Sequence, residues 1–264
     1  MTLTHYQVPA WHSQGDLLHG FLGREGGKSL PPYAGLNLST RVGDDPSAVK
    51  DNVCDMKKAL GLHNVRIVTM DQCHGDDIID VTEPRKEAGI GDAMVTSLPG
   101  LFLGVLTADC TPILFWSATQ RTRLAAVVHA GWRGTLAGLV AKMVAHIEKH
   151  YSVEPTELHC ALGPTIDGCC YEVGDDVAGP LTTKWGATAA RATRMVKGHI
   201  HVDLRQLNAA LLEAAGVPGQ QITRVGPCTA CTPAEFFSHR RETKAGTLQT
   251  GRQMSVIGWS PTHE

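Results

Sequence analysis

Short apolar runs bounded by polar or turn residues most constrain the fold of this chain. Runs of about four to eight apolar residues are typical of buried strands. They lie at Val65–Thr69, Leu101–Thr107, Pro112–Trp116, Leu124–His129, Leu158–Leu162 and Met254–Trp259. Two of them flank Ser117–Thr122, which predicts a hairpin and hence a mixed sheet. Because helices and strands do not alternate strictly, we expect an α+β fold, a layered α/β sandwich with mixed sheets.

Three segments with apolar residues at helical spacing predict helices. The first runs from Pro46 to Leu60, the second follows the 131–134 turn and ends at Lys149–His150, and the third runs from Asp203 to Gly216. Asp45 before Pro46 is typical of a helix start, and Gly216 is typical of a left-handed helix stop.

Composition narrows the function classes. The chain has 264 residues and a net charge of -2, so we expect one domain over residues 1–264 without a basic surface for nucleic acid. No apolar stretch approaches the ~20 residues of a membrane helix, and His5, His12 and Asp16 interrupt any export signal. We therefore expect a cytoplasmic protein that binds neither nucleic acid nor membrane and is a monomer or homodimer.

Three residues of metal-binding type stand at or just beyond apolar runs: His74, Cys110 and His129. Two imidazoles and one thiolate bind zinc and leave a fourth position open, which is typical of a catalytic site. Zinc lowers the pKa of water in that position toward ~7. Taken singly, each residue also fits ordinary packing or hydrogen bonding, and the spacing alone does not separate these interpretations.

A series of motifs resembles the YfiH family, also known as the polyphenol oxidoreductase laccase or peptidoglycan editing factor family. The motifs are His19-Gly20-Phe21, Gln72-Cys73-His74-Gly75, Ala108-Asp109-Cys110, His129-Ala130-Gly131-Trp132-Arg133-Gly134, Cys170-Tyr171-Glu172-Val173, Phe237-Ser238-His239-Arg240-Arg241 and Gly251-Arg252-Gln253. Three positions depart from the pattern: Leu22-Gly23 replace the usual Ser-Thr, and Val53 replaces the usual Arg after Asn52. These departures leave the specificity among purine nucleosides open.

The resemblance implies a purine nucleoside phosphorylase that acts with phosphate on adenosine, inosine and S-methyl-5'-thioadenosine and also deaminates adenosine. It further implies a zinc ion held by His74, Cys110 and His129. The implied fold is an αββα sandwich similar to the catalytic domain of the cytotoxic necrotizing factor.

Further residues are candidates for the substrate site. The Gly131–Gly134 turn leads into a helix whose N-terminus favours an anion, and Arg133 can add a charge-assisted contact to phosphate. Asp109 is a candidate general acid or base, or a residue that orients a metal ligand. Arg24 and Asn37 are candidate substrate contacts. Each of these residues also fits a role without contact to substrate, such as a turn former, a loop hydrogen bond or a solvated side chain.

The remaining cysteines have no assigned chemistry. Eight cysteines without an export signal favour thiols, metal ligands or a nucleophile over a disulfide framework. Cys228 and Cys231 match half of a zinc deaminase signature, with His146 and Glu148 as the other half, but we interpret that match as accidental. The pair is otherwise a redox pair, a second metal site or free thiols, and Cys169-Cys170 are expected to be loop or core thiols.

Other functions compete with the nucleoside enzyme. A copper-dependent polyphenol oxidase fits because a Cys/His set also binds Cu²⁺. A cysteine hydrolase fits with Cys110 as nucleophile and His129 or His74 as base. The peptidoglycan editing name of the family implies cell-wall precursors as substrates, hydrolysed through Cys110 or through the metal site. A non-enzymatic binding module would leave the three ligand-type residues at element ends unexplained.

Overall fold

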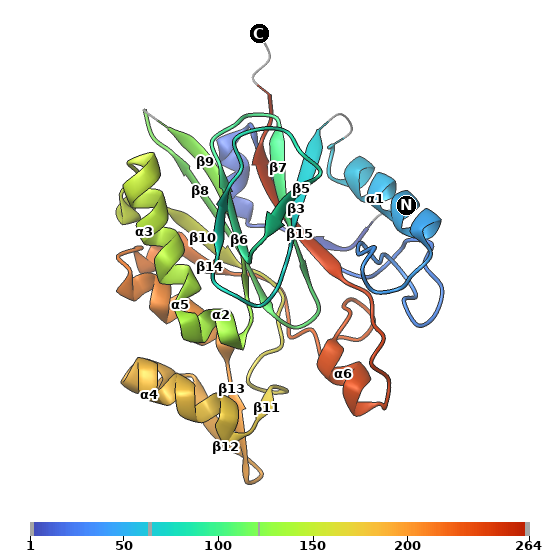
Figure 1. Ribbon diagram of the computed structural model, residues 1–264, viewed down its shortest axis with the longest axis vertical. Coiled ribbons are helices and arrows are strands. Elements are labelled where there is room, and N and C mark those ends of the chain that lie inside the picture. Colours follow the sequence, from blue (N-terminus) through green and yellow to red (C-terminus); the bar gives the residue numbers. More distant parts are fainter. Residues whose placement is uncertain (1–2, 63–64, 121, 262–264) are drawn as a thin grey trace.

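Two six-stranded sheets packed face to face form the centre of the computed structural model (Figure 1), which describes residues 3–62, 65–120 and 122–261. The first sheet has the order β1 (His5–Tyr6), β2 (Leu17–Leu22), β15 (Gln253–Trp259), β7 (Leu101–Thr107), β3 (Arg66–Asp71) and β5 (Glu87–Ile90). The second has the order β14 (Ile222–Arg224), β10 (His159–Leu162), β8 (Thr111–Ala118), β9 (Arg123–Ala130), β6 (Ala93–Thr96) and β4 (Ile78–Asp80).

Both sheets are mixed, as the sequence predicts. In the first sheet β7 is antiparallel to β15 and parallel to β3. In the second sheet β8 and β9 form the predicted antiparallel hairpin, which pairs Thr111 with Ala130. The end of β9 therefore lies beside the start of β8.

Helices cover the outer faces of the two sheets. Helix α1 (Pro46–Ala59) packs on the first sheet, and α2 (Trp132–Ala137), α3 (Leu139–Tyr151) and α5 (Leu204–Ala214) pack on the second. The side chain of Asp45 caps α1 by accepting a hydrogen bond from the Ser47 amide, and Asp203 caps α5 in the same way from Gln206. The layer order α, β, β, α is therefore the one that the family resemblance implies.

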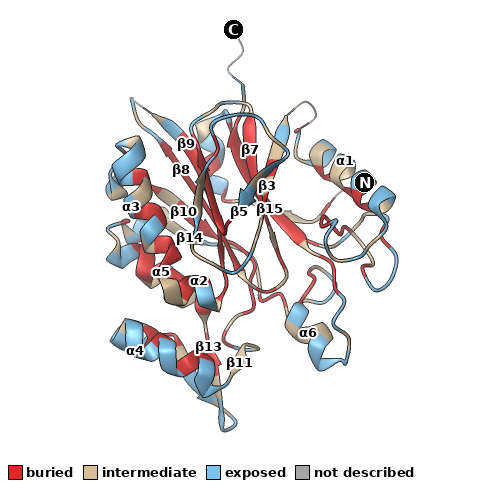
Figure 2. Cartoon of the chain, in the orientation of Figure 1, coloured by how far each residue is buried: buried red, intermediate tan, exposed pale blue. Residues whose placement is uncertain are grey.

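Most of the apolar runs form strands that are buried on both faces (Figure 2), whereas β3 is buried only at Val68 and Met70. Along β9, Ala126 and Val128 face the helices, whereas Ala125 and Val127 face the first sheet. A strand that is buried on both faces needs a continuous apolar run rather than an alternating one. The centre of the sandwich lies between the sheets and includes Phe21, Leu103, Trp116, Ile257 and Trp259.

Other elements differ from the sequence expectation. The predicted second helix is two helices, because Gly138 adopts the left-handed conformation with φ of 89° and ends α2 before α3 begins. The sequence did not predict α4 (Asp175–Arg191), the sheet of β11 (Glu172–Val173), β13 (His199–Val202) and β12 (Thr193–Val196), or α6 (His239–Lys244). Short 3-10 turns occur at Pro9–Gln14, Pro155–Glu157 and Gly219–Gln221. Among the described residues no helix has the length and apolarity to cross a membrane.

Candidate metal centre

The three residues of metal-binding type meet at one end of the sandwich. His74 follows β3 of the first sheet, Cys110 precedes β8 in the connection between the sheets, and His129 lies near the end of β9. Their ligand atoms all lie within 4.8 Å of one another, and the sulfur of Cys110 is 3.8 Å from Nε2 of His74. The end of β3 in the first sheet thus lies beside the start of β8 and the end of β9 in the second sheet.

A buried carboxylate that the sequence did not single out holds two of these residues. Asp92, directly before β6, accepts hydrogen bonds from the backbone amides of Cys73, His74 and Gly75 at 2.6–3.2 Å. Its Oδ1 atom also contacts Nδ1 of His129 at 2.8 Å. These bonds fix the turn in which His74 has a φ of 61°, and they leave Nε2 of His129 for a metal.

The same contacts set the charges of the site. Burial alone would raise the pKa of Asp92, but the bond to His129 and the amide donors lower it to about 2. Burial lowers and the Cys110 thiolate raises the pKa of His129, with a net rise to about 9. Burial would raise the pKa of the Cys110 thiol, and the charges and hydrogen bonds of His129 and His74 lower it to about 6. Cys110 is therefore a thiolate at neutral pH.

This donor set fits a metal ion. A thiolate and two imidazoles supply three ligands, which zinc accepts in sites that keep one position open. All three side chains line one cavity of about 560 Å³, a volume within the usual range for small-molecule sites. The fit extends to copper, since soft thiolate and imidazole ligands also bind that ion.

The cavity is rich in arginine. Its wall contains the three donor residues together with Asp71, Asp109, Trp132, Tyr171, Arg41, Arg133, Arg240 and Arg252. Arg41 is paired with Asp71 and Glu87, whereas Arg133 stacks on the ring of Trp132 at 4.3 Å and has no ion pair within the described residues. Since Arg133, Arg240 and Arg252 have no ion pair within the described residues, their guanidinium groups give the wall a surplus of positive charge suited to an anion.

Asp109 lines the cavity, but other protein groups already occupy both of its carboxylate oxygens. Thr229 donates its hydroxyl to Oδ1 and the backbone amide of Arg240 donates to Oδ2, each at 2.6 Å. Asp109 is buried with a φ of 94°, so these bonds hold the sharp turn that presents the adjacent Cys110. The geometry therefore favours a positioning role.

Arg24 and Asn37 do not line this cavity. Arg24 donates to the carbonyl of Ala34 at 2.8 Å and lies over the ring of Phe237. Asn37 is fully buried, and its Oδ1 atom accepts a hydrogen bond from the backbone amide of Arg252 at 2.9 Å. Asn37 thus holds a residue of the wall, and direct contact of either side chain with substrate stays a prediction.

Sequence motifs contained several of the other wall residues without assigning them a role. Trp132, Tyr171, Arg240 and Arg252 all lie within motifs that carried the family resemblance. The deaminase half-signature does not assemble in the described chain: His146 contacts Asp80 at 3.0 Å instead of the later cysteines.

Known proteins match this chain over most of its length. Residues 18–260 match the family described as multi-copper polyphenol oxidoreductase laccase. The chain is 38% identical over 240 residues to a protein of Deinococcus radiodurans named purine nucleoside phosphorylase, covering 91% of this chain and 88% of the relative. It is 35% identical over 221 residues to an adenosine deaminase of an unknown prokaryotic organism, covering 79% and 82%.

The fold is also that of a solved structure. The Bacillus licheniformis hypothetical protein YfiH superposes with a TM-score of 0.86 and 32% sequence identity, covering 95% of this chain and 94% of that chain.

Replacing Asp92 by asparagine is expected to weaken zinc binding by about 10- to 100-fold, because groups that orient a ligand usually matter to that extent. The amide offers one acceptor oxygen in place of two and turns an N–H group toward other donors. Competition with a chelator of known affinity measures the change. Asp77→Asn, which alters an exposed carboxylate of the same connection, is the control and should bind like wild type. Equal affinity of both variants would contradict the role of Asp92.

In metal-free protein, alkylation of Cys110 by iodoacetamide should reach half its maximal rate near pH 6, because the thiolate is the reacting form. Cys73 is an internal control, since its hydrogen bond to Asp92 raises its pKa. It should react only under more alkaline conditions. Peptide mapping by mass spectrometry separates the two, and a single shared pH profile would contradict the thiolate assignment.

Proposed function

The chain belongs to the YfiH family, described as multi-copper polyphenol oxidoreductase laccase, and on this premise we propose that it is a zinc-dependent purine nucleoside phosphorylase. Adenosine, inosine and S-methyl-5'-thioadenosine are the proposed substrates, with deamination of adenosine as a second reaction. One observation carries the proposal: a single cavity combines the His74, Cys110 and His129 donor set with four arginines.

Phosphorolysis requires that phosphate and nucleoside be held side by side. The phosphate oxygen attacks the ribose C1' atom, the bond from C1' to the purine nitrogen breaks, and the purine leaves with the electron pair and gains a proton. Arginine forks bind phosphate oxygens in pairs, so Arg133 is assigned to the phosphate. Helix α2, which contains Arg133, has only six residues, so the side chain and not the helix dipole is assigned the main role.

Aromatic and metal-binding groups complete the proposed site. Trp132 and Tyr171 supply flat apolar surfaces for a purine ring in the same cavity. A zinc ion held by His74, Cys110 and His129 supplies a Lewis acid when bound. Asp109 is assigned to positioning Cys110, because acid or base work at the purine would require it to give up a hydrogen bond from Thr229 or Arg240.

Copper-dependent oxidation of polyphenols is the second candidate, and the description of the family favours it. The cavity of the described chain brings together three His and Cys donors, enough for one ion. A multi-copper centre needs more histidine ligands than this set supplies. We therefore rank the oxidase below the nucleoside enzyme.

Chromatography of the products from adenosine, with and without phosphate, tests the proposal. Zinc-loaded protein should yield adenine and ribose-1-phosphate only when phosphate is present, and inosine in either case. Cys110→Ala should lose both activities, whereas Cys54→Ala, at an exposed position of α1, should retain them. Zinc-loaded protein that leaves adenosine unchanged would overturn the proposal, and phenol oxidation by copper-loaded protein would then favour the second candidate.

Arg133→Ala should raise the KM for phosphate by roughly 10- to 100-fold, the effect of removing a charge-assisted hydrogen bond worth about 1.5–3 kcal/mol. Steady-state kinetics at saturating nucleoside measure it. Arg123→Ala is a matched control, because Arg123 is also exposed and stacks on a tryptophan, Trp259, but lies outside the cavity. An unchanged KM for phosphate in Arg133→Ala would remove this residue from the phosphate site.

A further inference from the structure

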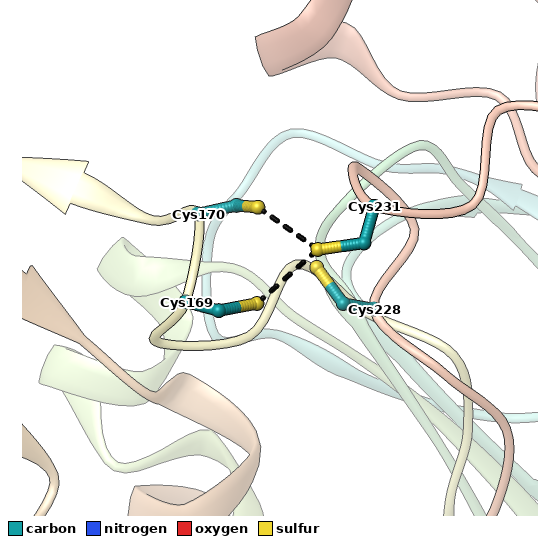
Figure 3. Close-up of side chains that lie close together, drawn as sticks. All are labelled: Cys169, Cys170, Cys228 and Cys231. Atoms are coloured by element: carbon teal, nitrogen blue, oxygen red, sulfur yellow. Dashed lines mark hydrogen bonds between the residues drawn. The ribbon is translucent and has the colours of Figure 1, made fainter.

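Four cysteines outside the cavity converge on one point (Figure 3). Cys169 and Cys170 lie between β10 and β11, and Cys228 and Cys231 lie after β14. Their sulfur atoms all lie within 4.8 Å of one another. The sulfur of Cys231 is 3.4 Å from that of Cys169 and 3.2 Å from that of Cys170. Residues some 60 positions apart in the chain thus form one cluster of sulfur atoms.

The cluster is not a set of packed core thiols. Cys169 and Cys231 are exposed and Cys170 is partly exposed, so apolar packing does not account for their convergence. A single disulfide does not account for it either, because Cys231 approaches both cysteines of the facing loop about equally. A common partner for all four sulfur atoms explains both observations.

The distances suit a tetrahedral metal ion. Zinc binds thiolates at about 2.3 Å, which places the sulfur atoms of a regular tetrahedron about 3.8 Å apart. The separations in the cluster run from 3.2 Å to no more than 4.8 Å and so bracket that value. The backbone amide of Asp167 points at the sulfur of Cys228 at 3.4 Å, a contact that stabilises a thiolate.

We propose that Cys169, Cys170, Cys228 and Cys231 bind a zinc ion at a second site, distinct from the cavity. Four protein ligands leave no open position, so the site is structural. On binding, the thiols release their protons to the solvent and the ion joins the two loops. The proposal does not depend on the reaction that the cavity performs.

The two loops joined at this site also hold parts of the cavity. Thr229 follows Cys228, and its hydroxyl donates to Asp109 while its amide donates to the carbonyl of Thr165 at 2.9 Å. Tyr171 follows Cys170 and lines the cavity. A metal between the loops therefore fixes the distance between the support of Asp109 and an aromatic wall of the cavity.

Counting zinc by elemental mass spectrometry in loaded and desalted protein tests the proposal. Wild type should hold two ions per chain, Cys231→Ser one, Cys110→Ser one, and the double variant none. Cys54→Ser, the matched control, should hold two. Since Cys110→Ser removes only the cavity ion, loss of the cavity site and loss of the second site give different counts.

Cobalt substitution gives a second measurement that needs no change in the cluster. In the Cys110→Ser protein, bound Co²⁺ should show the strong thiolate charge-transfer absorption and visible bands of a tetrahedral tetrathiolate. Weak visible bands without charge transfer would overturn the proposal, as would a wild-type count of one zinc that Cys231→Ser retains. A disulfide from Cys231 to Cys169 or Cys170 in freshly purified protein would assign the cluster to redox chemistry instead.

Discussion

The hydrogen bonds of one buried carboxylate, Asp92, are the interaction on which the cavity depends. Asp92 directly precedes β6 of the second sheet, yet it accepts hydrogen bonds from three successive amides of the turn that follows β3 of the first sheet. Burial of a charge is unfavourable unless donors surround it, and here the amides and His129 supply them. The carboxylate thereby joins the two sheets where the candidate metal ligands meet, because it holds the backbone of His74 and orients the imidazole of His129.

Further hydrogen bonds connect the strands near Asp92 to the rest of the cavity. The side chain of Gln72 bonds both the amide and the carbonyl of Leu106, at 2.9 and 2.7 Å, and so ties the end of β3 to β7. Strand β7 leads into the turn of Asp109, whose oxygens bind Thr229 and Arg240 from the C-terminal part of the chain. The donor set is therefore held from the sandwich on one side and from the late loops on the other.

The sequence predicted the structural features that depend on residues close together in the chain. Continuous apolar runs, the Asp45 cap and the β8–β9 hairpin all depend on neighbouring residues, and each was confirmed. His74, Cys110 and His129 were found through their motifs, because their spacing alone carried no signal. The role of Asp92 and the convergence of Cys169 with Cys231 were not predicted, since each depends on contacts between residues far apart in the chain. The break at Gly138 was missed because the apolar spacing continues across it.

The donor residues of the cavity and its arginine and aromatic residues are held by different parts of the structure. We therefore expect them to differ in how well they tolerate substitution. The candidate metal ligands lie at the ends of strands of the sandwich, where a shift disturbs its close packing. Arg133 instead is exposed and held by stacking on Trp132, and Tyr171 lies on a loop beside the cysteine cluster. Substitutions of such exposed or loop residues alter contacts with a ligand at little expense in fold stability. Under the proposed function, the same donor set is compatible with different substrates, and the arginines and aromatic rings around it are the groups expected to select among them.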